Sequence, residues 1–197
     1  MRTQMSMLTI INAALSAQGL DEVTSLQDGS PEFRILSRQW PFIVEAALET
    51  GRFPFARNEY FSASRVQGKF GFKDGYAFPE VALHVRSVWT VVREVKMDPI
   101  WVQDGSHVYV DEPEGVWMEY ATVPDPSFWG ANFSLGVQLR LQSVIARATQ
   151  SGDVSNLESQ AEMAFERAMT AASKARSDQT PARMSSFAAA RFGRGST

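Results

Sequence analysis

The chain has 197 residues, of which 44% are hydrophobic and 21% charged, so it carries enough apolar material for one folded domain with a core. It has no cysteine and only two histidines, which excludes disulfides, thiolate metal sites and cysteine catalysis. The net charge is −3, and no apolar run reaches the roughly 18 residues that a membrane span needs.

Two helices are predicted in the first 51 residues. Residues 7–17 place Met7, Ile11 and Leu15 on one face, and a glycine follows as a stop signal. After a polar loop, Pro31 suits the first turn of a second helix, which is predicted to run to about residue 50. Gly51 then ends it.

Between residues 52 and 123 glycine, proline and aromatic residues become dense and the hydrophobic period falls to two. The segment FPFARNEYFSAS is predicted to be extended, VQGKFGFKDGYAFP to be a loop or hairpin, and VALHVRSVWTVVREV to be a strand. Turn signals at Asp104-Gly105 and Glu114-Gly115 predict an antiparallel meander of three or four strands.

Helical periodicity returns at Asp125, which can cap a helix whose apolar face includes Phe128 and Phe133. Ser155 and Glu158 form a capping-box pattern for the last helix, expected to end near residue 176. Residues 177–197 have no sustained period and are predicted to form a flexible tail.

This order predicts an α+β fold, in which a bundle of about four helices carries an antiparallel β-sheet inserted between helices two and three, with an extended C-terminal tail. The corresponding divisions are residues 1–51 for the first two helices, 52–124 for the β-domain, 125–176 for the last two helices and 177–197 for the tail.

Candidate catalytic and metal-binding residues are few. The chain has no P-loop and no dinucleotide-binding glycine motif. His84 and His107 are interpreted as ordinary strand residues. Asp104, His107 and Asp111 are close in sequence, but they lack a second histidine nearby, so no metal or cofactor is predicted.

A cluster of acids at a turn leaves one enzymatic alternative open. Asp111, Glu112 and Glu114 offer paired carboxylates of the kind that glycan hydrolysis uses, although solvated acids are common in turns. The favoured prediction is that the protein is not an enzyme. A cell-wall (peptidoglycan) hydrolase is the alternative, for which mutation of Glu112 or Glu114 would abolish cleavage.

Three acids in the last predicted helix share one face, because Glu158, Glu162 and Glu166 are spaced four residues apart. Four interpretations remain open for this row: a solvated face, pairing with Arg140 and Arg147 of the preceding helix, pairing with a neighbouring subunit, and lining of an acidic channel.

Positive charge is concentrated at the C-terminal end. Residues 171–197 have a charge balance of +4, which leaves −7 for the rest of the chain. Such asymmetry is typical of an interaction tail. Apolar anchors alternate there with arginines, a pattern that suits a protein groove and is less typical of nucleic-acid binding; the candidate residues are Arg183, Met184, Phe187, Arg191 and Phe192.

Four segments in order resemble the head–tail adaptor proteins of tailed bacteriophages, in particular the tail tubular protein A group, and adaptors of phage-like particles such as gene transfer agents. They are LTIINAALSAQGLDEVTSLQDGSPE, the passage from Trp40-Pro41 to FPFARNEY, GYAFPEVALHVRSVW, and YATVPDPSFWGANFSLGVQLRLQSVIARAT. Together they span about residues 7–170. Phe53 stands where many members carry tryptophan, and the tail matches only loosely.

The resemblance implies a structural connector without catalytic groups. It implies a homo-oligomeric ring, commonly of twelve copies, that lies between the portal and the next tail component, a stopper or nozzle. DNA would pass through the ring without specific recognition, and no membrane is involved. The C-terminal segment would reach the portal. The location implied is the virion or phage-like particle, assembled in the bacterial cytoplasm.

Overall fold

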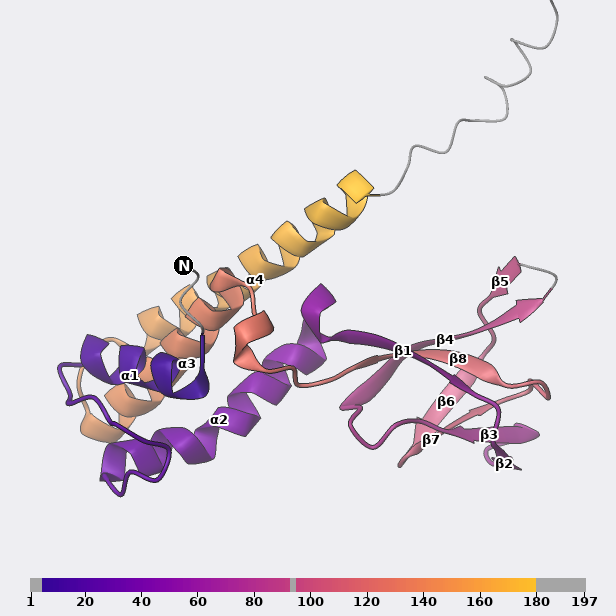
Figure 1. Ribbon diagram of the computed structural model, residues 1–197, viewed down its shortest axis with the longest axis horizontal. Helices are drawn as coiled ribbons and strands as arrows, with labels where there is room; N and C mark the ends of the chain where they lie inside the picture. Colours follow the sequence, from indigo (N-terminus) through magenta and orange to yellow (C-terminus); the bar gives the residue numbers. More distant parts are fainter. Residues whose placement is uncertain (1–4, 93–94, 180–197) are drawn as a thin grey trace, which may run out of the picture.

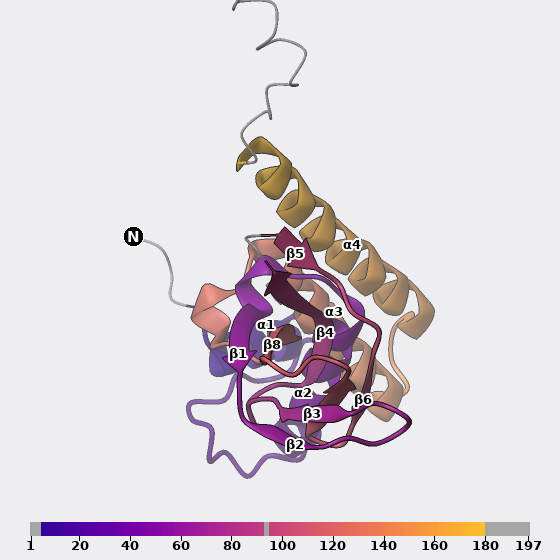
Figure 2. The same ribbon diagram turned by 90° about the vertical axis from the view of Figure 1, so that its right-hand side faces the viewer.

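The computed structural model describes residues 5–92 and 95–179. The molecule is elongated, with the helices gathered at one end and the strands at the other (Figure 1). Viewed from the strand end, the β-strands lie in front of the helices, and α4 extends beyond both (Figure 2).

The helical end contains α1 (Met7–Ala17), α2 (Pro31–Thr50), α3 (Ala131–Thr149) and α4 (Val154–Gln179). Helix α3 is central, because α1, α2 and α4 all pack against it. The final turns of α4 project past the other helices.

One hydrophobic core joins these helices. Its fully buried members include Ile11 and Leu15 of α1, Leu36 of α2, and Phe133 and Leu141 of α3. The predicted face of α1 is therefore confirmed. The loop between α1 and α2 is held to the core by Asn12, which exchanges two hydrogen bonds of 2.8 and 3.0 Å with the backbone of Val23.

The strand end contains two antiparallel sheets among the described residues. The first sheet has the order β1 (Arg57–Ser62), β8 (Val116–Ala121), β4 (His84–Val92), β5 (Val95–Met97), and the second has the order β2 (Arg65–Gln67), β3 (Asp74–Ala77), β7 (His107–Val110), β6 (Trp101–Asp104). A second core lies between the sheets and includes Val88 and Met118 from one and Tyr76, Val108 and Val110 from the other.

The mixed α+β class is confirmed, and the eight described strands follow α2 and precede α3. The predicted single meander is wrong. The hairpin at Asp104-Gly105 forms as expected, joining β6 to β7, but β8 leaves that sheet and pairs with β1 and β4 instead. Gly115, at a φ of 103°, lies in the turn that redirects the chain. The segment predicted as a loop or hairpin becomes β2 and β3.

Two predicted caps are also wrong. Asp125 caps the short 3-10 helix Pro126–Phe128 by accepting a 2.8 Å hydrogen bond from the Ser127 N–H, and α3 starts only at Ala131. Phe128 consequently lies outside the core and is 70% exposed. Helix α4 is capped by Asp153, which accepts from the Asn156 N–H at 3.0 Å, so Ser155 and Glu158 do not form the expected cap.

The two ends are joined by an arginine and by aromatic packing. From β4, Arg86 donates hydrogen bonds to the carbonyl oxygens of Leu48, at 2.6 Å, and of Gly51 at the end of α2. Where the connecting segments enter the helical end, aromatic rings pack together around Phe133; they belong to Trp40, Phe53, Phe55, Trp129 and Phe165.

Candidate interaction groove

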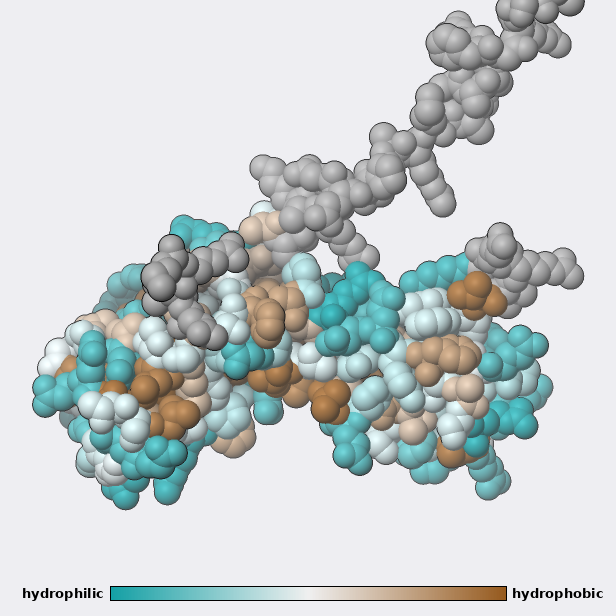
Figure 3. Space-filling model, viewed as in Figure 1, coloured by the Kyte–Doolittle hydropathy of each residue, from teal (hydrophilic) through white to brown (hydrophobic). Residues whose placement is uncertain are grey.

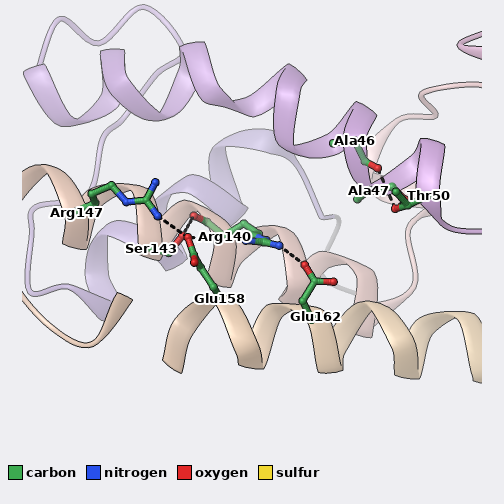
Figure 4. Close-up of polar contacts among 8 residues, drawn as sticks. All are labelled: Ala46, Ala47, Thr50, Arg140, Ser143, Arg147, Glu158 and Glu162. Atoms are coloured by element: carbon green, nitrogen blue, oxygen red, sulfur yellow. Dashed lines mark hydrogen bonds and ion pairs between the residues drawn. The ribbon is translucent and has the colours of Figure 1, made fainter. Parts of the chain in front are cut away.

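A groove of about 540 Å³ opens on the helical end between α2 and α4, with α3 as its floor. Helices α2 and α4 both contact α3, yet they stand apart from each other over this stretch (Figure 4). The groove forms because α2 and α4 pack on α3 without covering the face of α3 that lies between them.

The inner surface of the groove is largely apolar. Phe42, at the α2 wall, is 67% exposed, whereas Phe165 of α4 is almost buried deeper in the groove. The other apolar side chains of the lining are those of Ile43, Ala46, Ala47, Phe53, Val144 and Met169. Removal of apolar surface from water contributes about 25 cal/mol for each Å² that a partner covers, before the costs of association are counted.

Ion pairs line the α4 side of the groove. Arg147 Nη2 lies 2.6 Å from Glu158 Oε1, and Arg140 bonds Glu162 while its other terminal nitrogen lies 3.9 Å from Glu158 (Figure 4). Of the four interpretations of the acidic row, pairing with the preceding helix is confirmed for Glu158 and Glu162. These pairs cross from α3 to α4 and hold the two helices in register.

Glu166 differs from the other two acids of the row. It is exposed, lines the groove one turn further along α4, and forms no ion pair with any residue that the structure describes. Its carboxylate is thus available to a partner that enters the groove.

The other candidates from the sequence do not converge on the groove. His84 is half-buried at the start of β4, and its Nδ1 has no hydrogen-bond partner among the described residues. Burial, followed by the nearby positive charge of Arg86, lowers the pKa of His84 below its ordinary 6.5. His107 stacks on Tyr109, and its Nδ1 lies 3.2 Å from the Ser106 hydroxyl.

The acidic turn is held by backbone contacts on the strand end. Asp111 accepts a 2.7 Å hydrogen bond from the Lys73 N–H, and the Glu112 carbonyl accepts one from the Tyr76 hydroxyl. Glu114 is exposed. Asp111 is therefore engaged in fixing a loop, and none of these three acids lines the groove.

Within residues 5–92 and 95–179, no group of three or more histidine or acidic side chains is arranged to hold a metal ion. No described helix is both long and apolar enough to cross a membrane. The five tail candidates, Arg183, Met184, Phe187, Arg191 and Phe192, lie outside the described residues.

Sequence reasoning missed an aromatic row on the outer face of the first sheet. The strand register aligns Phe61, Trp117 and Trp89 across β1, β8 and β4, and the Lys96 ammonium lies 3.8 Å from the Trp89 ring centroid. The alternation of apolar and polar residues within each strand can be seen in the sequence. The alignment of the three rings depends on the pairing of β1 and β4 with β8, which joins distant parts of the chain. In the space-filling view, apolar residues gather over the helical end and the junction, and further patches lie on the strand end (Figure 3).

The α2 wall of the groove was also missed. Hydrophobic spacing assigned Ile43 and Ala47 to the buried face of α2. Phe42 and Ala46 are four residues apart and therefore share a second apolar strip on the same helix, which was not identified from the sequence. Comparison of the chain with protein-family models and with curated protein sequences gives no match.

Proposed function

We propose that the protein is a structural head–tail connector of a phage or phage-like particle. In this role it forms a ring between the portal and the next tail component and keeps a DNA channel continuous. The resemblance of the four sequence segments to head–tail adaptors is the origin of the proposal.

The observation that carries the proposal is the open groove between α2 and α4. An apolar hollow with a charged side is typical of a surface that another protein segment covers. A ring needs contacts between two different surfaces of neighbouring copies. Such contacts form a closed ring when the rotation from each copy to the next adds up to a full turn. The groove supplies one surface of that kind.

The elongated shape also supports a connector. The helical end offers the groove for contacts between copies, and the strand end lies far enough away to meet a different component. The outer face of the first sheet, with Phe61 and Trp117 partly exposed, is the surface we assign to the next tail component.

The charge of the chain fits passage of DNA without binding. The whole protein has a net charge of −3, and residues 1–170 are more acidic still. An acidic wall repels phosphates, so it does not supply the sequence-independent attraction by which proteins hold nucleic acid.

Assembly of particles tests the proposal. Particles made without this protein should accumulate filled heads that carry no tails, and addition of the purified full-length chain should restore joining. Normal joining in its absence would contradict the proposal. Peptidoglycan cleavage by the purified chain that is lost in Glu112→Gln or Glu114→Gln would instead support the hydrolase.

The contact with the portal is predicted from the resemblance alone, because the tail lies outside the described residues. Deletion of residues 177–197 should then prevent attachment to heads. Heads that still acquire tails with this shortened chain would contradict a portal contact through the tail.

A further inference from the structure

The groove lies over α3, at the position between α2 and α4 that a further helix could occupy. Helices α2 and α4 flank α3 without meeting, and the hollow between them exposes apolar side chains at its α2 wall and acids at its α4 wall. An amphipathic segment with anchors at positions i, i+3 or i+4, and i+7 or i+8 fits such a groove.

The last 18 residues of this chain contain a segment with that spacing. Met184, Ala188 and Phe192 follow one another at intervals of four, and Phe187 lies three residues after Met184. At about 100° per residue these four side chains would share one side of a helix. The same 18 residues carry three arginines and no acid.

The charges of the segment and of the groove are opposite in sign. At helical spacing Arg183 would lie beside Phe187, and Arg191 would lie between Phe187 and Met184. The α4 wall presents Glu166, which forms no ion pair with a described residue. Positive charge on the segment therefore matches this acid on the α4 wall.

Distances argue that the segment reaches the groove of another copy. The groove extends along α4 to Met169, ten residues before the helix ends at Gln179, which is about 15 Å of helix. Pro181 interrupts a helix soon after. If the chain turned back there, a helix over residues 182–192 would span only about 16 Å, so only its last anchor would regain the near end of its own groove.

We propose that residues 180–197 of one copy occupy the groove between α2 and α4 of the adjacent copy. This assignment rests on the proposed function, because it names the contact that links copies within the ring. It gives residues 180–197 to the adjacent copy in place of the portal contact that the resemblance implies. The donor segment and the acceptor groove are different surfaces, as a head-to-tail contact requires. Each copy would give one arm and receive one.

The absence of native cysteine makes a disulfide test clean. One full-length variant carries Ala46→Cys in the α2 wall of the groove, and a second carries Ala188→Cys in the segment. Mixed and mildly oxidised, they should form the mixed dimer about tenfold faster than a control mixture, because docking raises the effective concentration of the two thiols. The control replaces Ala46→Cys by Ala63→Cys, an exposed position on the strand end.

A second pair of variants separates docking from folding. Phe42→Glu should reduce the cross-linking of the same pair to the level of the control, whereas Phe128→Glu should leave it unchanged, since both rings are similarly exposed, at 67% and 70%. Their thermal unfolding should match that of the parent chain.

Three results would overturn the inference. If the test and control mixtures cross-link equally while the chain still forms rings, the segment is not the contact that links copies. A third variant carries both Ala46→Cys and Ala188→Cys, and a disulfide that forms only within this chain would place the segment in its own groove. Loss of head attachment on deleting the segment, with cross-linking at the control level, would assign it to the portal.

Discussion

At the scale of single residues, Arg86 is the side chain that fixes the strand end to the helical end. Its guanidinium reaches from β4 to the last carbonyl groups of α2, which have no partner within the helix. Burial of this group lowers the pKa of Arg86 below its ordinary value, although it remains charged at neutral pH. One cation therefore both caps a helix and joins two cores.

Replacing Arg86 should loosen this joint. We expect Arg86→Ala to lower the free energy of unfolding by about 1.5–3 kcal/mol, the range for hydrogen bonds to charged groups. Arg38→Ala, at an exposed position of α2, should change it by less than about 0.5 kcal/mol. Chemical denaturation measures both. Equal effects would mean that Arg86 does not hold the joint.

His84 should make stability depend on pH. Burial and Arg86 lower its pKa in the folded chain, with a smaller opposing effect from Glu49, so the unfolded chain binds the proton more readily. The free energy of unfolding should therefore fall as the pH drops below about 6.5, the ordinary pKa of histidine, and this contribution should be complete above that pH.

Replacement of His84 tests this pH dependence. In urea titrations between pH 7.5 and pH 5, the range in which histidine titrates, His84→Gln should flatten the decline in stability. A decline that persists unchanged in His84→Gln would show that other groups cause it.

At the scale of elements, the α3–α4 pair is held by apolar packing and by ion pairs that are half exposed. Because Glu162 is 59% exposed, its bond to Arg140 contributes little, and Glu162→Gln should cost about 0.2–1 kcal/mol at low salt. The loss should shrink in high salt. Glu166→Gln, one turn away, should have no measurable effect on unfolding. A loss that is independent of salt would contradict this account.

The elements could be predicted where the signal is local. Helices α1 and α2 follow from hydrophobic spacing and from Pro31, and the β6–β7 hairpin follows from Asp104-Gly105. The partners of β8 could not be predicted, because its pairing with β1 joins residues about 60 positions apart, from Arg57 and Ala121 to Ser62 and Val116. The start of α3 was misplaced because Asp125 and Pro126 initiate a 3-10 turn as readily as an α-helix.

The site could be predicted only in part for the same reason. The row of acids on α4 follows from helical spacing, and the pairing of Glu158 and Glu162 with Arg140 and Arg147 was one of the four interpretations that the sequence left open. The groove itself depends on α2 and α4 standing apart over α3, and that separation leaves no local signal. Arg86 was missed because its partners in α2 lie about 35 residues away in sequence.

At the scale of the whole molecule, the chain has two cores, an open groove on the helical end and an aromatic row on the strand end. Under the proposed function these surfaces would give one copy separate places to contact its neighbours and another component. On this account the acidic body surrounds the DNA path, while the basic C-terminal segment links protein to protein. The charge asymmetry of the sequence then reflects two different tasks.

The mass of the purified full-length chain in solution tests the central claim most directly. Sedimentation and light scattering, with images of the same sample, should show a closed ring of many copies, twelve if the resemblance extends to ring size. Removal of residues 180–197 should shift that species toward the monomer. A full-length chain that stays monomeric at every concentration and shows no ring in images would contradict the connector.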